Sequence, residues 1–311
     1  MPGSLAVEIL EAIATGFRNK GLRDAGPRAE RSFDVGSFDR LVIAGPFDVE
    51  VRTGEDHGVE ADGPEDALQS LSVANEDDGL VITCQGRHAD AISIVVTMEQ
   101  LRDARFAGSG DVSINRVNGD TFECANSSSG DLEIGEVAVE SIRLSMAGSG
   151  DVHAGKVRTN EVQIVMAGSG DSGFEMIEAP LIKLTMNGSG DAQVDEFCGE
   201  QFEAALSGSG DLAVGSLNAN NAKLSLFGSG DVEIGGGQIE AAELTTSGSG
   251  DISAEDAEIA QAQISICGSG DMSLCVTGNA EVTVMGSGDV SIVGGAECTV
   301  RGNGSGDVCF S

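Results

Sequence analysis

The tetrapeptide Gly188-Ser189-Gly190-Asp191 decides the fold, because the chain repeats it at a fixed interval. Ten copies read Gly-Ser-Gly-Asp and one reads Ser128-Ser129-Gly130-Asp131. Their aspartates are 20 residues apart as far as Asp271 and 18 residues apart in the last two steps. A fixed period of this length is typical of solenoids, in which each repeat is one coil that buries its apolar face against its neighbours. The eleven aspartates are Asp111, Asp131, Asp151, Asp171, Asp191, Asp211, Asp231, Asp251, Asp271, Asp289 and Asp307.

Alternating apolar and polar residues flank each tetrapeptide. After Asp231, for example, Val232 and Ile234 are apolar and Glu233 between them is polar. Such alternation predicts a strand that buries one face. A second alternating segment leads into the next tetrapeptide in the same phase. A helical repeat would need a period of about 3.6 residues over about ten residues, and no copy has room for that.

The common phase of these short strands predicts an all-β fold, a single-domain, single-stranded parallel β-helix solenoid with about 20 residues per coil. The coils would stack at about 4.8 Å into a rod of roughly 50 Å. One outward row mixes both signs of charge, which relieves repulsion between stacked neighbours. Its members are Arg143, Gln163, Lys183, Glu203, Lys223, Glu243 and Gln263.

The tetrapeptide supports two interpretations. In the favoured one it is a structural corner, because glycine reaches positive φ without steric cost and Asp and Ser side chains bond nearby backbone amides. In the other, the eleven aspartates are ligands of divalent cations. Stacked carboxylates repel by roughly 0.9 kcal/mol in water, and calcium, which binds carboxylate oxygens, would relieve this. The known calcium-binding β-roll has a nonapeptide repeat with a different unit, which weighs against this second interpretation.

Residues 1–32 lack the repeat. Apolar residues at helical spacing from Leu5 to Phe17 predict a short amphipathic helix that would cap the solenoid, and a basic linker follows. Glu8 and Glu11 interrupt the apolar run that a secretory signal needs, so these residues alone predict a cytoplasmic location by default. No stretch reaches transmembrane length, which predicts no membrane insertion.

Residues 33–106 are rich in predicted strands but lack the tetrapeptide. We interpret them as irregular first coils of the same solenoid, so that one β-helix covers 33–311 and the repeats proper cover 107–311. Glycine, proline and aspartate mark the turns. The predicted strands are Arg40–Ala44, Phe47–Val51, Gly58–Ala61, Leu80–Cys84 and Ile92–Met98.

The motifs of this segment follow a specific order. Phe38-Asp39 and Gly45-Pro46-Phe47-Asp48-Val49-Glu50-Val51 come first, then Asp78-Gly79-Leu80-Val81-Ile82, then Ile94-Val95-Val96-Thr97-Met98, and then the tetrapeptides. In this order they resemble the putative auto-transporter adhesin head GIN domain family, a bacterial β-helix domain of unknown function, over about residues 33–311. The resemblance implies a right-handed β-helix in a cell-envelope or secreted protein, without enzymatic activity. It also implies adhesion to a cell-surface or matrix ligand.

The composition excludes several classes of partner. The net charge is −34 with only four lysines, which excludes nucleic acid and anionic membrane surfaces. The chain has no Trp and no Tyr, which argues against a tight preformed carbohydrate groove. Phenylalanines fall at inward positions of the repeat, as Phe122, Phe174, Phe202 and Phe310 do, and are expected to fill the core.

Cysteine and histidine spacing predicts no metal site. No cysteine pair has the Cys-x-x-Cys pattern, and His57, His88 and His153 are scattered. Most cysteines are expected to be reduced core residues, and a disulfide between Cys267 and Cys275 is the weaker alternative. The seven are Cys84, Cys124, Cys198, Cys267, Cys275, Cys298 and Cys309.

The favoured function is that of a non-enzymatic acidic rod for adhesion, whose aspartates would bind divalent cations only under the second interpretation of the tetrapeptide. Two alternatives stand beside it. One is a polysaccharide-active β-helix enzyme, which needs a local break in the repeat that pairs two carboxylates. Glu175 and Asp195 make such a break on consecutive coils, and Glu255 follows three coils later. Solvated surface acids explain these residues more simply, so no catalytic residue and no cofactor other than calcium is predicted. The other alternative is a purely structural spacer.

The last predicted strand ends at Phe310, with no capping segment after it. An uncovered coil exposes strand hydrogen-bonding groups. Either Phe310 closes the core, or two copies associate end to end as a homodimer.

Overall fold

The computed structural model describes residues 27–76 and 79–311. These residues form two compact units. Unit 1 comprises residues up to Glu140 and Gly148–Gly155, and unit 2 comprises Ser141–Ala147 and Lys156–Ser311. Each consists mainly of parallel strands stacked coil upon coil, so the predicted all-β parallel β-helix is confirmed. The predicted N-terminal helix lies outside the described residues, and the predicted domain limits and right-handedness stay predictions.

Unit 1 contains the irregular coils. All five strands predicted there are confirmed, as β2, β3, β4, β6 and β7, whereas β1, β5, β8 and the short helices have no counterpart among the predictions. Parts of β10 (Leu132–Met146) and β11 (Val152–Arg158) also belong to unit 1. The other elements are β1 (Arg28–Phe33), β2 (Arg40–Gly45), β3 (Asp48–Thr53), β4 (Gly58–Pro64), α2 (Glu65–Gln69), β5 (Leu71–Glu76), β6 (Gly79–Cys84), η1 (Ala89–Ala91), β7 (Ser93–Met98), β8 (Asp103–Gly108) and β9 (Val112–Asn126).

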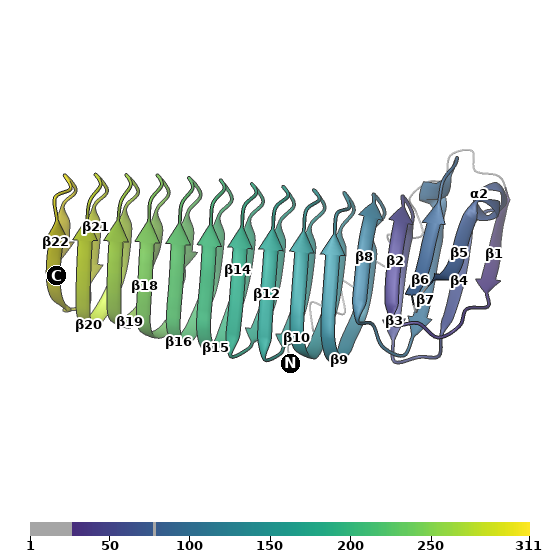
Figure 1. The fold of residues 1–311 in the computed structure, drawn as a ribbon, viewed down its shortest axis with the longest axis horizontal. Helices are drawn as coiled ribbons and strands as arrows, with labels where there is room; N and C mark the ends of the chain where they lie inside the picture. The colour runs from purple at the N-terminus through teal and green to yellow at the C-terminus, as the bar shows by residue number, and fades with distance from the viewer. Residues whose placement is uncertain (1–26, 77–78) are drawn as a thin grey trace, which may run out of the picture. The chain divides into compact units, whose positions relative to one another are not determined.

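The coils of unit 1 do not stack in sequence order. β2 pairs in parallel with both β6 and β8, and β3 pairs in parallel with both β7 and β9. The β2–β3 coil, first in the sequence, therefore lies between two coils that come later, as Figure 1 shows for β6, β2 and β8. This arrangement gives the coil two parallel neighbours, and its residues Leu41, Val49 and Val51 are fully buried.

Antiparallel strands cover the outer coil of unit 1. β5 pairs with β6, while β4 pairs with β7 and with β1. The linker predicted up to residue 32 is therefore wrong from Arg28 onward, because this segment is β1. Its basic residues form specific contacts: Arg28 pairs with Asp62, and Arg31 donates to the Leu68 carbonyl oxygen at 3.0 Å and lies over the Phe33 ring.

Unit 2 consists of repeats alone. Its strands stack in sequence order, and equivalent residues of consecutive coils are in register, as Leu184, Ala204, Leu224 and Leu244 are. Its elements, besides parts of β10 and β11, are β12 (Glu161–Met166), β13 (Ser172–Glu178), β14 (Leu181–Met186), β15 (Ala192–Leu206), β16 (Leu212–Leu226), β17 (Val232–Ile234), β18 (Gly237–Thr246), β19 (Ile252–Ile266), β20 (Met272–Val284), β21 (Val290–Val293), β22 (Glu297–Gly302) and β23 (Val308–Phe310).

The change from 20-residue to 18-residue coils occurs between β19 and β20. The register shifts between Ala254 and Glu258 and again between Ile259 and Gln261. Beyond these shifts the core row continues without a break, because Ile264 pairs with Val282 and both are buried. The shorter coil is thus accommodated in the first half of the strand, and the rows that lead into the tetrapeptide keep their phase.

Inward side chains form the core of each unit. Phe122, Phe174 and Phe202 are buried as expected, and Phe202 packs edge-on against Phe197 at 5.2 Å between ring centroids. The expectation is wrong for Phe310, which is 61% exposed although Ile292, in register with it, is buried. Phe310 and Val300 belong to the last described coil, whose strands β22 and β23 pair with β20 and β21.

Candidate functional site

The repeated aspartates stack at one corner of the coils. In unit 2, the backbone N–H of each aspartate from Asp191 to Asp307 donates to Oδ1 of the aspartate one coil earlier, at 2.7–2.8 Å. In unit 1, the same bond at 3.0 Å links Asp151 to Asp131, Asp131 to Asp111, and Asp111 to Asp48. We call this series the aspartate ladder. Its bonds join successive coils, which corrects the expectation that each carboxylate bonds an amide within its own turn.

Close stacking explains the glycine before the aspartate of each tetrapeptide. A β-carbon on Gly210 would overlap the carbonyl oxygen of Gly190 in the preceding coil, and Gly230 and Gly250 stand in the same relation to their predecessors. Among the described tetrapeptide glycines, only Gly108 has positive φ. The expected reason for glycine at this corner, its access to positive φ, is therefore wrong for most copies, which need glycine for the close approach of two backbones.

The cation interpretation of the ladder stays a prediction. Except for the half-buried Asp111, the eleven predicted aspartates are exposed, and a carboxylate that accepts one ladder bond has a second oxygen outside that bond. Within the described residues, no group of three or more His, Cys, Asp or Glu side chains has an arrangement that could hold a metal ion. Any cation on the ladder would therefore depend on oxygen ligands other than a compact carboxylate cluster.

Glu175, Asp195 and Glu255, the three acids that interrupt the repeat, lie on outward positions of the strands in unit 2. The register of β13 with β15 sets Glu175 and Asp195 on consecutive coils. Asp195 accepts a hydrogen bond from Gln193 at 2.7 Å and is exposed, as is Glu255. None of the three acids lines a hollow found in unit 2. Their placement therefore gives the enzymatic alternative no support.

The cysteines and histidines do not converge on a site. Cys84 and Cys124 are buried, but Cys198, Cys267 and Cys309 are exposed, so the expectation that most cysteines fill the core is wrong. All seven are free thiols, and burial raises the pKa of Cys124 to about 12. The histidines have separate neighbours: His57 bonds the Phe38 carbonyl oxygen, His88 faces Asp66, and His153 opposes the rise that burial causes in the pKa of Glu133.

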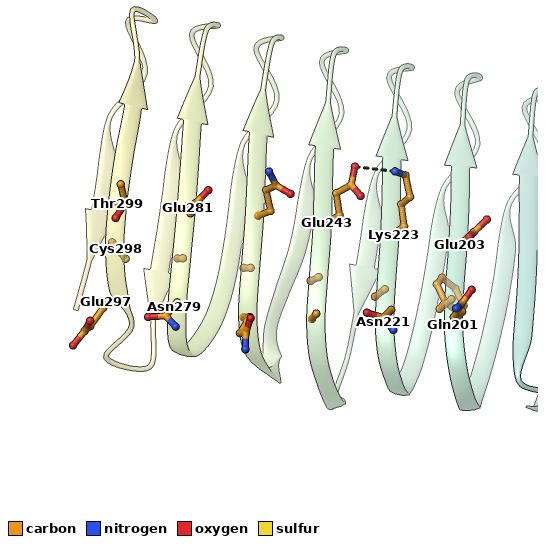
Figure 2. A pocket seen from close by; sticks show the side chains of 18 residues that line it. Gln201, Glu203, Asn221, Lys223, Glu243, Asn279, Glu281, Glu297, Cys298 and Thr299 are labelled. Atoms are coloured by element: carbon orange, nitrogen blue, oxygen red, sulfur yellow. Dashed lines mark hydrogen bonds and ion pairs between the residues drawn. The ribbon is translucent and has the colours of Figure 1, made fainter.

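A groove of about 910 Å³ runs across six consecutive coils of unit 2. Two outward rows form its sides, and the residue between them on each strand forms its floor (Figure 2). We call it the amide–carboxylate groove. One side comprises Gln201, Asn221, Ala241, Gln261, Asn279 and Glu297; the other comprises Glu203, Lys223, Glu243, Gln263, Glu281 and Thr299; the floor comprises Phe202, Ala222, Ala242, Ala262, Ala280 and Cys298.

The floor row explains why the groove lies on these coils. In the preceding coils of unit 2 the same row holds Ile142, Val162 and Ile182, and it continues through Phe202. From Ala222 the row consists of alanines, which are buried, and it ends in Cys298. An inward alanine fills less core volume than isoleucine or phenylalanine. We attribute the hollow between the two outward rows to this change.

The groove is polar and carries an excess of negative charge. Four carboxylates and one ammonium group line it. Lys223 donates to Glu243 at 2.8 Å, which leaves Glu203, Glu281 and Glu297 without an ion pair among the described residues. Five side-chain amides complete the sides, each with a donor and an acceptor. The only aromatic ring, Phe202, is fully buried, so no aromatic face is presented to a ligand.

A second hollow of about 550 Å³ has the same chemistry. It lies on the preceding residues of β15, β16, β18 and β19 and extends to Thr277 of β20. Amides and carboxylates line it again, including Asn220, Gln238, Glu240 and Glu258. The polar surface of these coils thus includes the residues that precede the amide–carboxylate groove on each strand.

The sequence contained signals for the groove that the repeat pattern concealed. The charged row from Arg143 to Gln263 was identified, and part of it forms one side of the groove. The amide row and the change from large to small inward residues at Ala222 were missed. Both rows have a fixed spacing from the repeated aspartates, so they can be identified in the sequence. The depth of the groove follows only from the packing of the coils.

No helix in the described parts of the chain is both long enough and apolar enough to cross a membrane.

Comparisons with known proteins show which family the chain matches. The model of the family described as putative auto-transporter adhesin, head GIN domain, matches residues 37–196 and 179–296. The chain matches no curated protein. Among solved structures it resembles a putative adhesin from Parabacteroides distasonis, with 16% identity, a TM-score of 0.42, and 92% of this chain and 98% of that chain covered. A putative adhesin from Bacteroides fragilis has 16% identity and a TM-score of 0.37, with 94% and 100% covered.

Proposed function

The chain belongs to the putative auto-transporter adhesin head GIN domain family, and we propose that it is a non-enzymatic surface-interaction module that binds its ligand in the amide–carboxylate groove. One observation carries this proposal: the groove is continuous across six coils, while the corner of the same coils repeats without change. A continuous open groove suits an extended ligand, which would contact several coils at once.

The groove has the composition of a binding surface. Its polar groups are amides and carboxylates on regular strands, so their positions are fixed by the stacking of the coils. General acid–base catalysis would need one carboxylate or histidine positioned against a reacting bond with its pKa adjusted to that task. The groove instead spreads its amides and carboxylates over six coils, an arrangement that distributes contacts along a ligand.

A blocking substitution tests this proposal. Ala241 is half-buried in the middle of one side of the groove, and Ala213 is an exposed outward residue of the neighbouring coil outside it. Ala241→Arg should abolish saturable binding to cells or immobilised matrix, whereas Ala213→Arg, which adds the same charge, should not. Equal binding by the two variants would contradict the groove as the binding surface, and a blank screen with the wild-type chain would contradict the function itself.

Three finer features belong to the same proposal. We propose a location in the cell envelope or outside the cell, in line with the family, and cell fractionation with an antibody tests it. Divalent cations on the aspartate ladder would suit an extracellular location. End-to-end association would cover Val300 and Phe310, which are 47% and 61% exposed. A monomeric mass at high concentration, measured by sedimentation, would exclude such a dimer.

A further inference from the structure

We propose that the occupant of the amide–carboxylate groove is an extended polypeptide segment rich in lysine and arginine. This inference rests on the proposed function, because it names the ligand class of the same groove. It follows from three properties of the lining residues: the sign of their charge, the pairing capacity of their amides, and the absence of an exposed ring.

The charge of the groove selects a cationic ligand. Lys223 is paired with Glu243. Glu203 lies in register with Lys183 and Lys223 but forms an ion pair with neither, and Glu281 and Glu297 have no cationic residue in register with them, so these three carboxylates are available to a ligand. They lie on three different coils, so a ligand with cationic groups at intervals would meet them in turn. The overall charge of −34 attracts such a ligand from a distance and repels anionic polymers.

The amides select a backbone that has both donors and acceptors. Gln201, Asn221, Gln261, Gln263 and Asn279 each present one carbonyl oxygen and one NH2 group. Every peptide unit likewise presents one N–H and one C=O. An amide side chain can therefore pair with both groups of one peptide unit, whatever the neighbouring side chain is. Amides would hold the backbone while carboxylates bind basic side chains.

The length of the groove fits a short segment. Six coils place the first and last rows about 24 Å apart, a distance that an extended peptide covers with about seven residues. A sugar chain is the less suitable occupant, because apolar faces of sugar rings pack on exposed aromatic rings and the groove presents none.

The experiment uses the full chain and a labelled peptide of about twelve residues that alternates lysine with serine. Fluorescence anisotropy should show saturable binding that weakens with salt. A peptide that alternates glutamate with serine should not bind. The triple variant Glu203→Gln/Glu281→Gln/Glu297→Gln should weaken binding of the lysine peptide at least tenfold. The matched control Glu233→Gln/Glu255→Gln/Asp256→Asn removes the same charge from exposed residues outside the groove and should change affinity less than threefold.

A second arm tests the role of the amides. Asn221→Ala/Asn279→Ala should weaken binding several-fold without changing its salt dependence, because the substitution removes no charge. An oligosaccharide of amino sugars, titrated in parallel, separates the two ligand classes. If it binds as tightly as the lysine peptide, or if the control triple variant loses as much affinity as the groove variant, the polypeptide proposal is overturned.

The outcomes distinguish this inference from the proposed function. One outcome is that the lysine peptide fails to bind the wild-type chain, while another surface ligand binds it and does not bind the Ala241→Arg variant. In that case the groove is a binding surface, but the proposed ligand class is wrong. If neither binds, both proposals fail.

Discussion

The corner and the groove of unit 2 belong to the same coils but differ in how they vary. The corner keeps its Gly-Ser-Gly-Asp in every coil, since a β-carbon on its second glycine would overlap the previous coil and its aspartate bonds the next one. The groove changes from coil to coil, with Gln, Asn or Ala on one side and Glu, Lys, Gln or Thr on the other. Uniform residues therefore mark what stacking requires, and variable residues mark a surface that is free to acquire a ligand.

The largest expected effect concerns the second glycine of the corner. Gly210→Ala places a methyl group against the Gly190 carbonyl oxygen, so two coils must separate. We expect the free energy of unfolding to fall by at least about 4 kcal/mol, or the chain to fail to fold. The control Gly236→Ala meets nothing closer than 3.8 Å and should leave stability unchanged or raise it by about 0.4–1 kcal/mol. Urea unfolding measures both, and equal losses would contradict the stacking argument.

Much of this corner could be predicted from the sequence, because a period of 20 residues fixes which residues stack. The prediction that Asp satisfies backbone amides was right in kind, but its partner lies one coil away, which only stacking reveals. Asp48 shows the limit of the motif, because it accepts the ladder bond from Asp111 without a Gly-Ser-Gly before it. The inserted β2–β3 coil and strand β1 could not be predicted either, because their partners are distant in sequence.

The next effect separates the hydrogen-bond acceptor of a ladder aspartate from its negative charge. Asp211 Oδ1 accepts the Asp231 N–H at 2.8 Å. Asp211→Ala leaves that donor without its partner and should cost about 1–2 kcal/mol. Asp211→Asn keeps an acceptor oxygen and removes one charge from a stack of carboxylates, so its stability should stay within about 0.5 kcal/mol of the wild type. A loss with Asn as large as with Ala would show that the charge, and not the acceptor, is required.

Calcium binding by the aspartate ladder would give the corner a function besides stacking. If calcium binds only the folded ladder, each site adds about 1.4 kcal/mol at a free concentration ten times its Kd. The melting temperature should then rise with calcium beyond the rise with sodium at matched ionic strength. Asp191→Asn/Asp211→Asn should reduce that rise. Identical curves with calcium and with a chelator would leave the aspartates as stacking residues alone.

The smallest expected effect on stability lies in the groove. Lys223 and Glu243 form an ion pair at 2.8 Å, and both side chains are about half exposed, at 52% and 51%. Exposed pairs contribute little, so Lys223→Gln should change the free energy of unfolding by less than about 0.5 kcal/mol. Its effect on binding should be the opposite of that of the Glu→Gln variants, because it removes the only ammonium in the groove and releases Glu243.

The affinity for the lysine peptide should therefore rise a few-fold in Lys223→Gln, and the salt dependence should steepen because one more carboxylate is available. Lys156→Gln is the matched control, since Lys156 is exposed on β11 and does not line the groove. If both lysine variants raise affinity equally, the gain reflects the overall charge of the chain. A gain confined to Lys223→Gln places the cationic ligand in the groove, on coils whose corner is the same as in every other repeat.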